Sequence, residues 1–357
     1  LPNQRKEVKE MAGPRGYHSY RGRSPKWKIV LAVLLVLVIL GSVGFMMVQE
    51  RIVYDETGTP HLMVPEKKKE DPPPEEEPVN ITIQQTEKNQ RLQAVQLGDD
   101  PAAWLAEVEA AGGQNAFAVT VKAPGGQLRY PFAEASAVSG ASAAKTAAAA
   151  AEALPALLEG GRYVIARISC LRDGGVARNN VETMGLKNTG GYIFYDGNNE
   201  NWLDPSKQAT RDYLCALAVE CADLGFDEIL LTDLTYPTVG KLDKIAYGSD
   251  PAYGTQAAYN TEQIANLLAA VKDALGDRDV KLSLELSEAV LGNDGVDETA
   301  GIDLWNTLMA RLDRVYVPTA EDRVDAMVTD AEEGVLIPEL TAVPTTTEYQ
   351  SYLLLRG

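Results

Sequence analysis

Acidic side chains interrupt several of the apolar runs in this sequence. Asp233 lies near the end of the run EILLTDL, Glu285 lies in KLSLEL, and Glu339 lies in GVLIPEL. Two carboxyl groups, one protonated and one ionised, are sufficient to hydrolyse a glycosidic bond without a metal or a cofactor. We therefore predict Asp233, Glu285 and Glu339 as catalytic residues, with Asp233 paired with either glutamate. We expect no cofactor, and no ligand spacing argues for a metal.

Two basic residues occur in comparable positions. Lys122 ends the run FAVTVK, and Arg167 lies within YVIARISC. A charge in an otherwise apolar strand is costly unless it is paired or lies at a solvated end. A cation of this kind keeps one carboxylate ionised while a more desolvated partner shifts toward protonation. We predict that Lys122 and Arg167 contact substrate.

The distribution of histidines narrows the chemistry further. The chain of 357 residues has two, His18 and His61, and none between residues 79 and 357. That stretch therefore cannot use Ser-His-Asp hydrolysis, Cys-His proteolysis or an H-E-x-x-H zinc site. The net charge of −18 argues against nucleic acid as a partner. The three cysteines lack C-x-x-C spacing, so we interpret them as buried apolar residues.

Short apolar runs alternate with helical patterns from about residue 90 onward. The predicted strands are 92–97, 117–122, 163–170, 228–234, 281–286, 314–319, 334–340 and 351–355. The predicted helices are 101–111, 143–158, 208–224, 261–275, 299–312 and 321–332. This rhythm predicts an α/β fold, a (β/α)8 TIM barrel. The competing fold is a doubly wound open sheet, but no G-x-G-x-x-G follows the first strand.

Strand alternation predicts which side chains face the barrel interior. Val121 belongs to an apolar set that faces the helices, which leaves Lys122 pointing inward. By the same reasoning Leu284 faces outward while Glu285 and Glu339 face inward. Because barrel enzymes form their active sites at the C-terminal ends of the strands, we expect these charged residues to meet there.

Aromatic residues are frequent in two long connections of the predicted barrel. Trp202 lies in the connection after the third strand, and Tyr236 lies in the one after the fourth. Aromatic faces pack on the apolar faces of sugar rings, and phenol hydroxyls bind their edges. We predict Trp202 as a sugar-stacking platform and Tyr236 as a further substrate-binding residue.

The N-terminal part of the chain differs in composition from the barrel. Residues 1–28 carry eight Lys/Arg and two Glu, and residues 29–48 contain no charge. Twenty apolar residues span roughly 30 Å as a helix, the thickness of a bilayer core. We predict a cytoplasmic tail (1–28), a single transmembrane helix (29–48), a charged Pro-rich stalk (49–90) and an extracellular barrel domain (91–357).

Segments of the predicted barrel resemble a bacterial glycoside hydrolase family with a TIM-barrel domain. They include VTVKAPGGQLRY, YVIARISCLRD, NWLDPSK and a fourth-strand segment, FDEILLTDLTYP, that resembles the family motif F-D-Y-V-R-F-P. The resemblance implies Lys122, Arg167, Asp173, Trp202 and Asp233 as site residues. The sequence departs from the family pattern at three positions in strands two and four, where the family has Asp, Asp and Arg and this chain has Thr120, Ala123 and Thr235.

Two functions follow from these patterns. The first is a membrane-anchored extracellular glycoside hydrolase that acts on a polysaccharide or cell-wall glycan by two-carboxylate acid/base catalysis. The alternative is a catalytically diverged carbohydrate-binding or cell-envelope scaffold protein on the same barrel. Retention of Asp233 with a second carboxylate favours the enzyme, and loss of the strand-two acids favours the binding protein.

Overall fold

The computed structural model of the chain falls into two compact units, residues 1–82 and 83–357. It describes residues 52–54, 60–62, 91–288, 296–297, 302–303, 311–327, 334–345 and 349–356. The predicted tail (1–28) and transmembrane helix (29–48) lie outside these residues. Among the described helices, none has the length and apolar character needed to cross a bilayer.

The described part of the first unit is a β-hairpin. Strand β1 (Ile52–Tyr54) pairs antiparallel with β2 (Pro60–Leu62), with Val53 opposite His61. The hairpin lies in the segment predicted as a stalk, and residues 63–90 of that segment lie outside the described residues.

The second unit contains a closed barrel of eight parallel strands, as the alternating pattern predicts. The strands are β3 (Gln93–Gln96), β4 (Ala116–Lys122), β7 (Tyr163–Ser169), β8 (Glu228–Thr232), β9 (Lys281–Glu285), β12 (Arg314–Pro318), β13 (Leu336–Leu340) and β14 (Tyr352–Leu354). They follow one another around the barrel in chain order, and the pairings of β3 with β14 and with β4 close it. All eight predicted strands are confirmed, each within a few residues.

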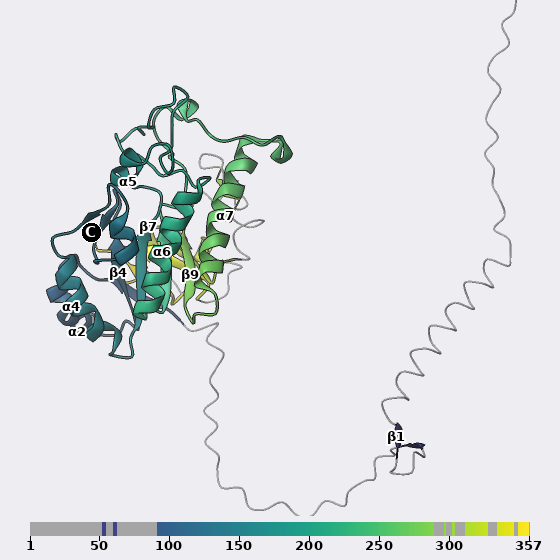
Figure 1. Ribbon diagram of the computed structural model, residues 1–357. Helices are drawn as coiled ribbons and strands as arrows, with labels where there is room; N and C mark the ends of the chain where they lie inside the picture. Colours follow the sequence, from purple (N-terminus) through teal and green to yellow (C-terminus); the bar gives the residue numbers. More distant parts are fainter. Residues whose placement is uncertain are drawn as a thin grey trace, which may run out of the picture. The chain divides into compact units, whose positions relative to one another are not determined.

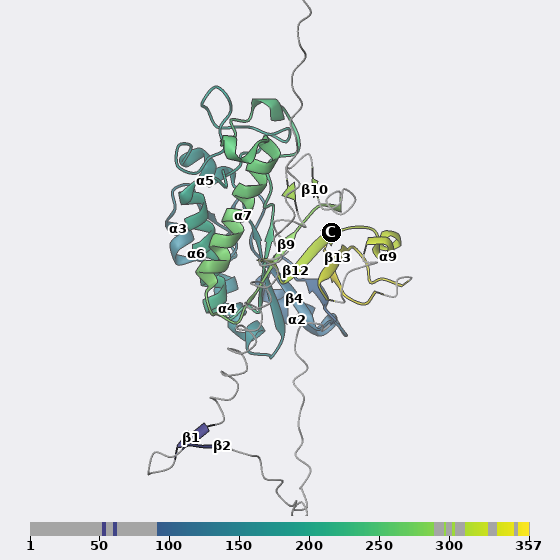
Figure 2. The same cartoon turned by 90° about the vertical axis from the view of Figure 1, so that its right-hand side faces the viewer.

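Helices cover the outside of this barrel. They are α2 (Trp104–Ala110), α3 (Ala133–Ala137), α4 (Ala147–Leu158), α5 (Gly174–Asn179), α6 (Gln208–Leu224), α7 (Gln256–Leu275) and α9 (Val324–Met327). Figure 1 shows α6 and α7 side by side against the strands. Figure 2 shows α4, α6 and α7 on one side of the strands and α9 on the other.

The observed helix boundaries agree with the predicted ones more closely in some parts of the chain than in others. The prediction for 208–224 is confirmed to the residue, while α7 begins at Gln256, five residues before the predicted start. The Thr255 hydroxyl accepts a hydrogen bond from Ala258 N and caps that earlier start. Most of the helix predicted over 299–312 lies outside the described residues, which there include the short hairpin of β10 (Val296–Asp297) and β11 (Ile302–Asp303).

Apolar side chains form two layers, one between strands and helices and one inside the barrel. Phe117, Val119 and Leu284 face the helices, and small or branched residues such as Ala118 and Ile165 fill the interior. The alternation predicted for the second, fifth and seventh strands is therefore confirmed for these apolar positions, as buried parallel strands require.

Strand β4 departs from regular alternation near its C-terminal end. Its pairing with β7 shifts between Thr120 and Lys122, so that Lys122 lies opposite Ile168. Ile168 packs against the helices, and Lys122 points to the same side, with its Nζ 5.7 Å from the ring centre of Tyr213 on α6. The prediction that Lys122 faces the barrel interior is wrong, because a β-bulge inserts one extra residue into the strand.

A buried charged network closes the N-terminal end of the barrel interior. Arg314 Nη1 donates to Glu228 Oε2, to which Tyr163 also donates (2.7 Å). Tyr316 (2.7 Å) and Ser283 (2.5 Å) donate to Oε1. Glu228 has no exposed surface and Arg314 is 5% exposed. A buried ion pair is tolerable when hydrogen bonds satisfy it in this way, and it then becomes costly to break.

We expect Arg314→Met to lower the free energy of unfolding by about 3–5 kcal/mol, because it leaves the Glu228 carboxylate buried without a cation. Urea denaturation of the full chain, followed by circular dichroism, measures this. The double variant Glu228→Met/Arg314→Met removes both charges and should recover part of the loss. Arg278→Met, which breaks the exposed pair with Asp223, should cost far less, because solvent screens that pair. Equal losses for Arg314→Met and Arg278→Met would contradict this account of the network.

Candidate active site

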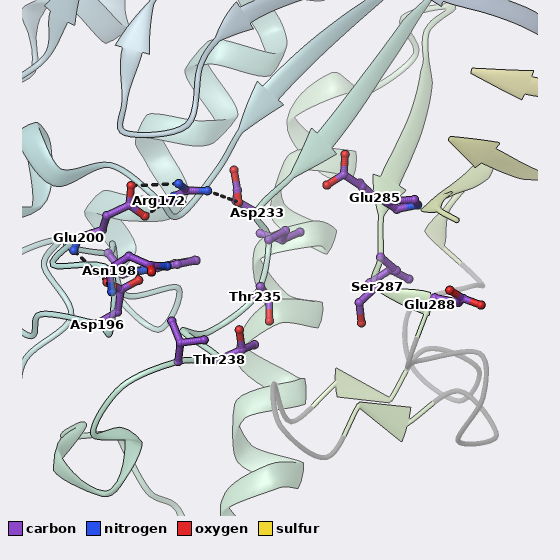
Figure 3. A pocket seen from close by; sticks show the side chains of 15 residues that line it. Arg172, Asp196, Asn198, Glu200, Asp233, Thr235, Thr238, Glu285, Ser287 and Glu288 are labelled. Carbon is purple, nitrogen blue, oxygen red and sulfur yellow. Dashed lines mark hydrogen bonds and ion pairs between the residues drawn. The ribbon is translucent and has the colours of Figure 1, made fainter. Parts of the chain in front are cut away.

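A hollow of about 430 Å³ lies at the C-terminal end of the barrel strands (Figure 3). Its walls come from the connections after β7, β8 and β9 and from the end of β12. The charged and polar lining residues are Arg172, Asp196, Asn198, Glu200, Asp233, Thr235, Thr238, Glu285, Ser287 and Glu288. This is the end of the barrel at which the sequence places the site.

Asp233 follows β8 and has a backbone conformation that is rare for its residue type. Its φ of 50° lies in the left-handed region, which costs a residue other than glycine roughly 1–3 kcal/mol. Its Oδ2 accepts a hydrogen bond from Ser169 Oγ (2.6 Å), and its Oδ1 lies 3.8 Å from Arg172 Nη1. The carboxylate is therefore fixed at the hollow by a hydroxyl donor and a cation.

Arg172 is itself fixed by Glu200. Its Nη2 donates to Glu200 Oε1 (2.9 Å), and its Nε donates to Oε2. The hydrogen bond to Glu200 raises the pKa of Arg172, so the guanidinium stays charged beside Asp233. Figure 3 shows Arg172 between Glu200 and Asp233. The sequence prediction missed both residues, although Arg172 directly follows the third predicted strand.

Glu285 reaches the hollow from β9, the strand next to β8. Figure 3 shows it across the hollow from Asp233. Its Oε2 lies 2.5 Å from Arg167 Nη2, whose side chain is 12% exposed inside the barrel. The prediction that Glu285 points inward is confirmed, because its side chain meets that of Arg167 from β7 inside the barrel.

Glu339 shares the same guanidinium from β13. Its Oε1 lies 3.5 Å from Arg167 Nη2, and its side chain has no exposed surface. Neither carboxyl oxygen of Glu339 accepts a hydrogen bond from a donor among the described residues. Its inward direction is as predicted, but it does not line the hollow.

One cation therefore serves two buried carboxyl groups, and burial decides their protonation. Desolvation raises the pKa of Glu285, the charge of Arg167 and a hydrogen bond with Glu339 oppose this, and the charge of Asp233 raises the pKa further. Desolvation likewise raises the pKa of Glu339 to about 8, with Arg167 lowering it and Glu285 raising it. Glu285 accepts a hydrogen bond from Arg167, whereas the Glu339 oxygens have no donor among the described residues, so a proton on Glu339 that is donated to Glu285 gives Glu339 its hydrogen bond. With its pKa of about 8, Glu339 holds this proton at neutral pH.

Lys122 and Asp173 form a second buried ion pair, away from the hollow. Lys122 Nζ lies 3.1 Å from Asp173 Oδ2 and donates to the Ser169 carbonyl oxygen (2.6 Å). Asp173 Oδ1 accepts from Val176 N (3.0 Å) and caps α5. Both side chains are almost completely buried, so in this position they fix the strand end and α5 and do not reach the hollow.

The two predicted aromatic residues also differ in position. Trp202 lines the hollow but is 7% exposed, and its Nε1 donates to Asp196 Oδ2 (3.0 Å). Tyr236 is 2% exposed and packs edge-on against Tyr247 with ring centres 5.2 Å apart. Tyr236 therefore belongs to the packing behind the hollow rather than to its lining.

Nothing in the described part of the chain resembles a metal centre. No group of three or more His, Cys, Asp or Glu side chains there converges closely enough to hold an ion.

Residues 100–306 match a protein family described as "Putative glycosyl hydrolase domain". The match covers more than half of the chain, and the chain therefore belongs to this family. The resemblance that the sequence motifs indicate is confirmed. No curated protein sequence matches the chain.

Several solved structures are similar to the chain at low identity. A crystal structure of a hypothetical protein from Ruminiclostridium thermocellum is 23% identical, with 50% of this chain and 87% of that one covered and a TM-score of 0.42. The glycoside hydrolase domain of PgaB (BpsB) from Bordetella bronchiseptica is 12% identical, with 75% and 94% covered and a TM-score of 0.49. Aspergillus fumigatus Ega3, in complex with galactosamine, is 10% identical, with 75% and 91% covered and a TM-score of 0.41. None of these values is high enough to transfer a function.

We expect Glu339→Gln to remove part of the dependence of stability on pH. The native pKa of about 8 lies above the ordinary value of 4.5, so the contribution of Glu339 to stability is complete below pH 4.5 and is lost as the pH rises through 8. The glutamine stays neutral throughout. The difference in unfolding free energy between the variant and the unmodified chain should therefore shift in favour of the variant by about 2 kcal/mol or more when the pH is raised from 5 to 9. Urea denaturation at each pH measures this. The exposed substitution Glu109→Gln is the control. A difference that does not change with pH would contradict the raised pKa.

Proposed function

We propose that the barrel hydrolyses O-glycosidic bonds of a polysaccharide, with Asp233 and Glu285 as the two reacting carboxyl groups. One observation carries the proposal: both groups line the same hollow from the ends of neighbouring strands, Asp233 beside the Ser169 hydroxyl and Glu285 beside Arg167. Membership in a glycosyl hydrolase family agrees with this chemistry. A protonated and an ionised carboxyl group on either side of a glycosidic bond supply the acid and the base or nucleophile that cleavage needs.

Glu285 takes the role of the acid. Desolvation raises its pKa, its neighbour Glu339 can supply a proton, and its side chain is 22% exposed at the hollow, so it can reach the leaving oxygen. Asp233 takes the opposite role. The hydroxyl of Ser169 and the charge of Arg172 face its oxygens and stabilise the ionised form, which acts as base on a water molecule or as nucleophile.

Glu339 supports Glu285 without touching substrate. It lies behind Glu285, shares Arg167 with it, and has no surface in the hollow. The two glutamates share one proton. Glu339 donates a hydrogen bond to Glu285 when Glu339 carries the proton, and accepts one from Glu285 when Glu285 carries it, as the acid is used and regenerated. We therefore assign Glu339 as a positioning residue, in place of the catalytic role that its sequence position indicates.

The charge of the hollow selects the kind of sugar. Among the described residues, five carboxyl groups line it (Asp196, Glu200, Asp233, Glu285 and Glu288), and Arg172 is the one basic residue in the lining. A wall of this charge repels sulfated or uronic acid polymers and accepts neutral or amino sugars. Thr235, Thr238 and Ser287 add hydroxyl groups to the lining, a group type that binds sugar hydroxyls.

The apolar segment at 29–48 and the charged segment after it support a membrane-anchored enzyme whose barrel acts on cell-wall or extracellular glycan. A non-catalytic carbohydrate-binding protein is the second candidate. Thr120 and Ala123 favour it, because they replace the strand-two acids of the family that the sequence resembles.

The assay that separates these two candidates follows reducing ends. We expect the full chain, kept in solution with a mild detergent, to release reducing ends from at least one neutral or amino-sugar polysaccharide and from no polyuronate. Asp233→Asn should lower the rate at least about 1,000-fold while glycan binding persists, because the substitution removes the charge that acts at the anomeric carbon. Glu109→Gln should keep full activity. Binding without release by the unmodified chain would establish the second candidate.

Leaving-group dependence tests the role of Glu285. We expect Glu285→Gln to slow hydrolysis of an alkyl glycoside severely and that of an activated nitrophenyl glycoside much less, because a good leaving group needs no proton. In the unmodified chain kcat/KM should fall as the pH rises through the raised pKa of Glu285, since the acid is then deprotonated. Equal losses on both substrates would assign the acid to another residue.

A further inference from the structure

A second hollow, of about 420 Å³, lies at the opposite, N-terminal end of the barrel. Its basic residues precede or begin four of the strands. Arg91 comes before β3, Arg162 comes before β7, Lys281 begins β9 and Arg314 begins β12. The hollow is therefore built by the barrel itself and does not depend on one loop.

The hollow carries an excess of positive charge. Asp227 is its one acidic lining residue, and Glu228 beneath the floor balances Arg314. Within the described ranges, Arg91, Arg162 and Lys281 form no ion pair with a carboxylate. After Asp227 is counted, two positive charges remain uncompensated. This is unexpected in a chain with 51 acidic and 33 basic residues.

The groups around this charge are held in place. Lys281 Nζ and Arg314 Cζ each lie 5.4 Å from the ring centre of Tyr163, which lines the hollow between them. Arg162 Nη1 donates to the carbonyl oxygens of Ala156 and Leu157 (3.3 and 3.4 Å) at the end of α4. These bonds orient the guanidinium and leave its other N–H groups available for a ligand.

We propose that this N-terminal hollow binds the phosphate group of a small phosphate monoester. A monoester phosphate carries nearly two negative charges at neutral pH, which matches the uncompensated charge, whereas a carboxylate or a phosphodiester carries one. The planar guanidinium forks of Arg91 and Arg162 suit paired phosphate oxygens. The volume lies in the range of small-ligand pockets.

The site is independent of the proposed hydrolase chemistry. It lies at the other end of the barrel, and no residue lines both hollows. Loss of phosphate binding leaves the glycan assay unchanged, and absence of glycan hydrolysis leaves phosphate binding unchanged. The two proposals therefore fail separately.

Isothermal titration calorimetry of the full chain at low salt tests the site with four probes: glucose 6-phosphate, inorganic phosphate, dimethyl phosphate and glucose. We expect both dianions to bind, at least about tenfold tighter than dimethyl phosphate, and glucose not to bind. Lys281→Gln and the exposed substitution Arg91→Gln should each weaken the binding of glucose 6-phosphate about tenfold and leave the circular dichroism spectrum unchanged. Lys145→Gln, an exposed lysine elsewhere, is the matched control.

The following results would overturn the proposal. They are no binding of either dianion at about 10 mM, equal binding of dimethyl phosphate, or unchanged affinity in both Arg91→Gln and Lys281→Gln. Binding of inorganic phosphate but not of glucose 6-phosphate would also overturn it, because the hollow would then recognise the free ion and not a monoester.

Discussion

One guanidinium serves two carboxyl groups in the upper interior of this barrel, and the character of the candidate active site depends on that imbalance. Arg167 can neutralise Glu285 or Glu339 but not both, and neither carboxyl group is open enough for water to stabilise a second negative charge. The arrangement of lowest free energy is one in which the pair of glutamates holds a proton. Glu339 then carries a proton that it can pass to Glu285 at the hollow, and across the hollow Asp233 is held among groups that stabilise a negative charge. Acid/base chemistry needs one protonated and one ionised carboxyl group, and here that difference arises because the barrel interior has fewer cations than carboxyl groups.

The other end of the same interior shows what the barrel does with a carboxylate that is fully satisfied. Glu228 has its own cation, Arg314, and accepts hydrogen bonds from two tyrosines and a serine. Glu228 itself has no exposed surface, and each of its oxygens accepts two of these hydrogen bonds. The two ends contain similar residue types, and the difference lies in the number of donors per acid: four for Glu228, and one shared guanidinium for Glu285 and Glu339. The same barrel can therefore be rigid at one end and reactive at the other.

The pattern of apolar residues along the sequence was sufficient to predict the barrel. Buried parallel strands give short apolar runs, and amphipathic helices give a helical period of apolar residues. Alternation then placed Glu285 and Glu339 inside correctly. It failed for Lys122, because the bulge in β4 is a tertiary feature without a local signal. The sequence also could not predict which aromatic residues are exposed. Tyr236, predicted to bind substrate, is instead buried in the packing behind the hollow. Arg172 and Glu200 were missed because their role exists only through a contact between a strand end and a loop 28 residues further on.

The proton shared by Glu285 and Glu339 can be observed directly. In the full chain labelled with carbon-13 at the glutamate carboxyl carbons, nuclear magnetic resonance follows the protonation of each group as the pH changes. The charge balance around Arg167 predicts at least one glutamate resonance that still reports a protonated carboxyl at pH 7, titrates near pH 8 and is missing from Glu339→Gln. Glutamate resonances that have all finished titrating below pH 6 would show that both carboxyl groups are ionised, and would contradict the proposed acid.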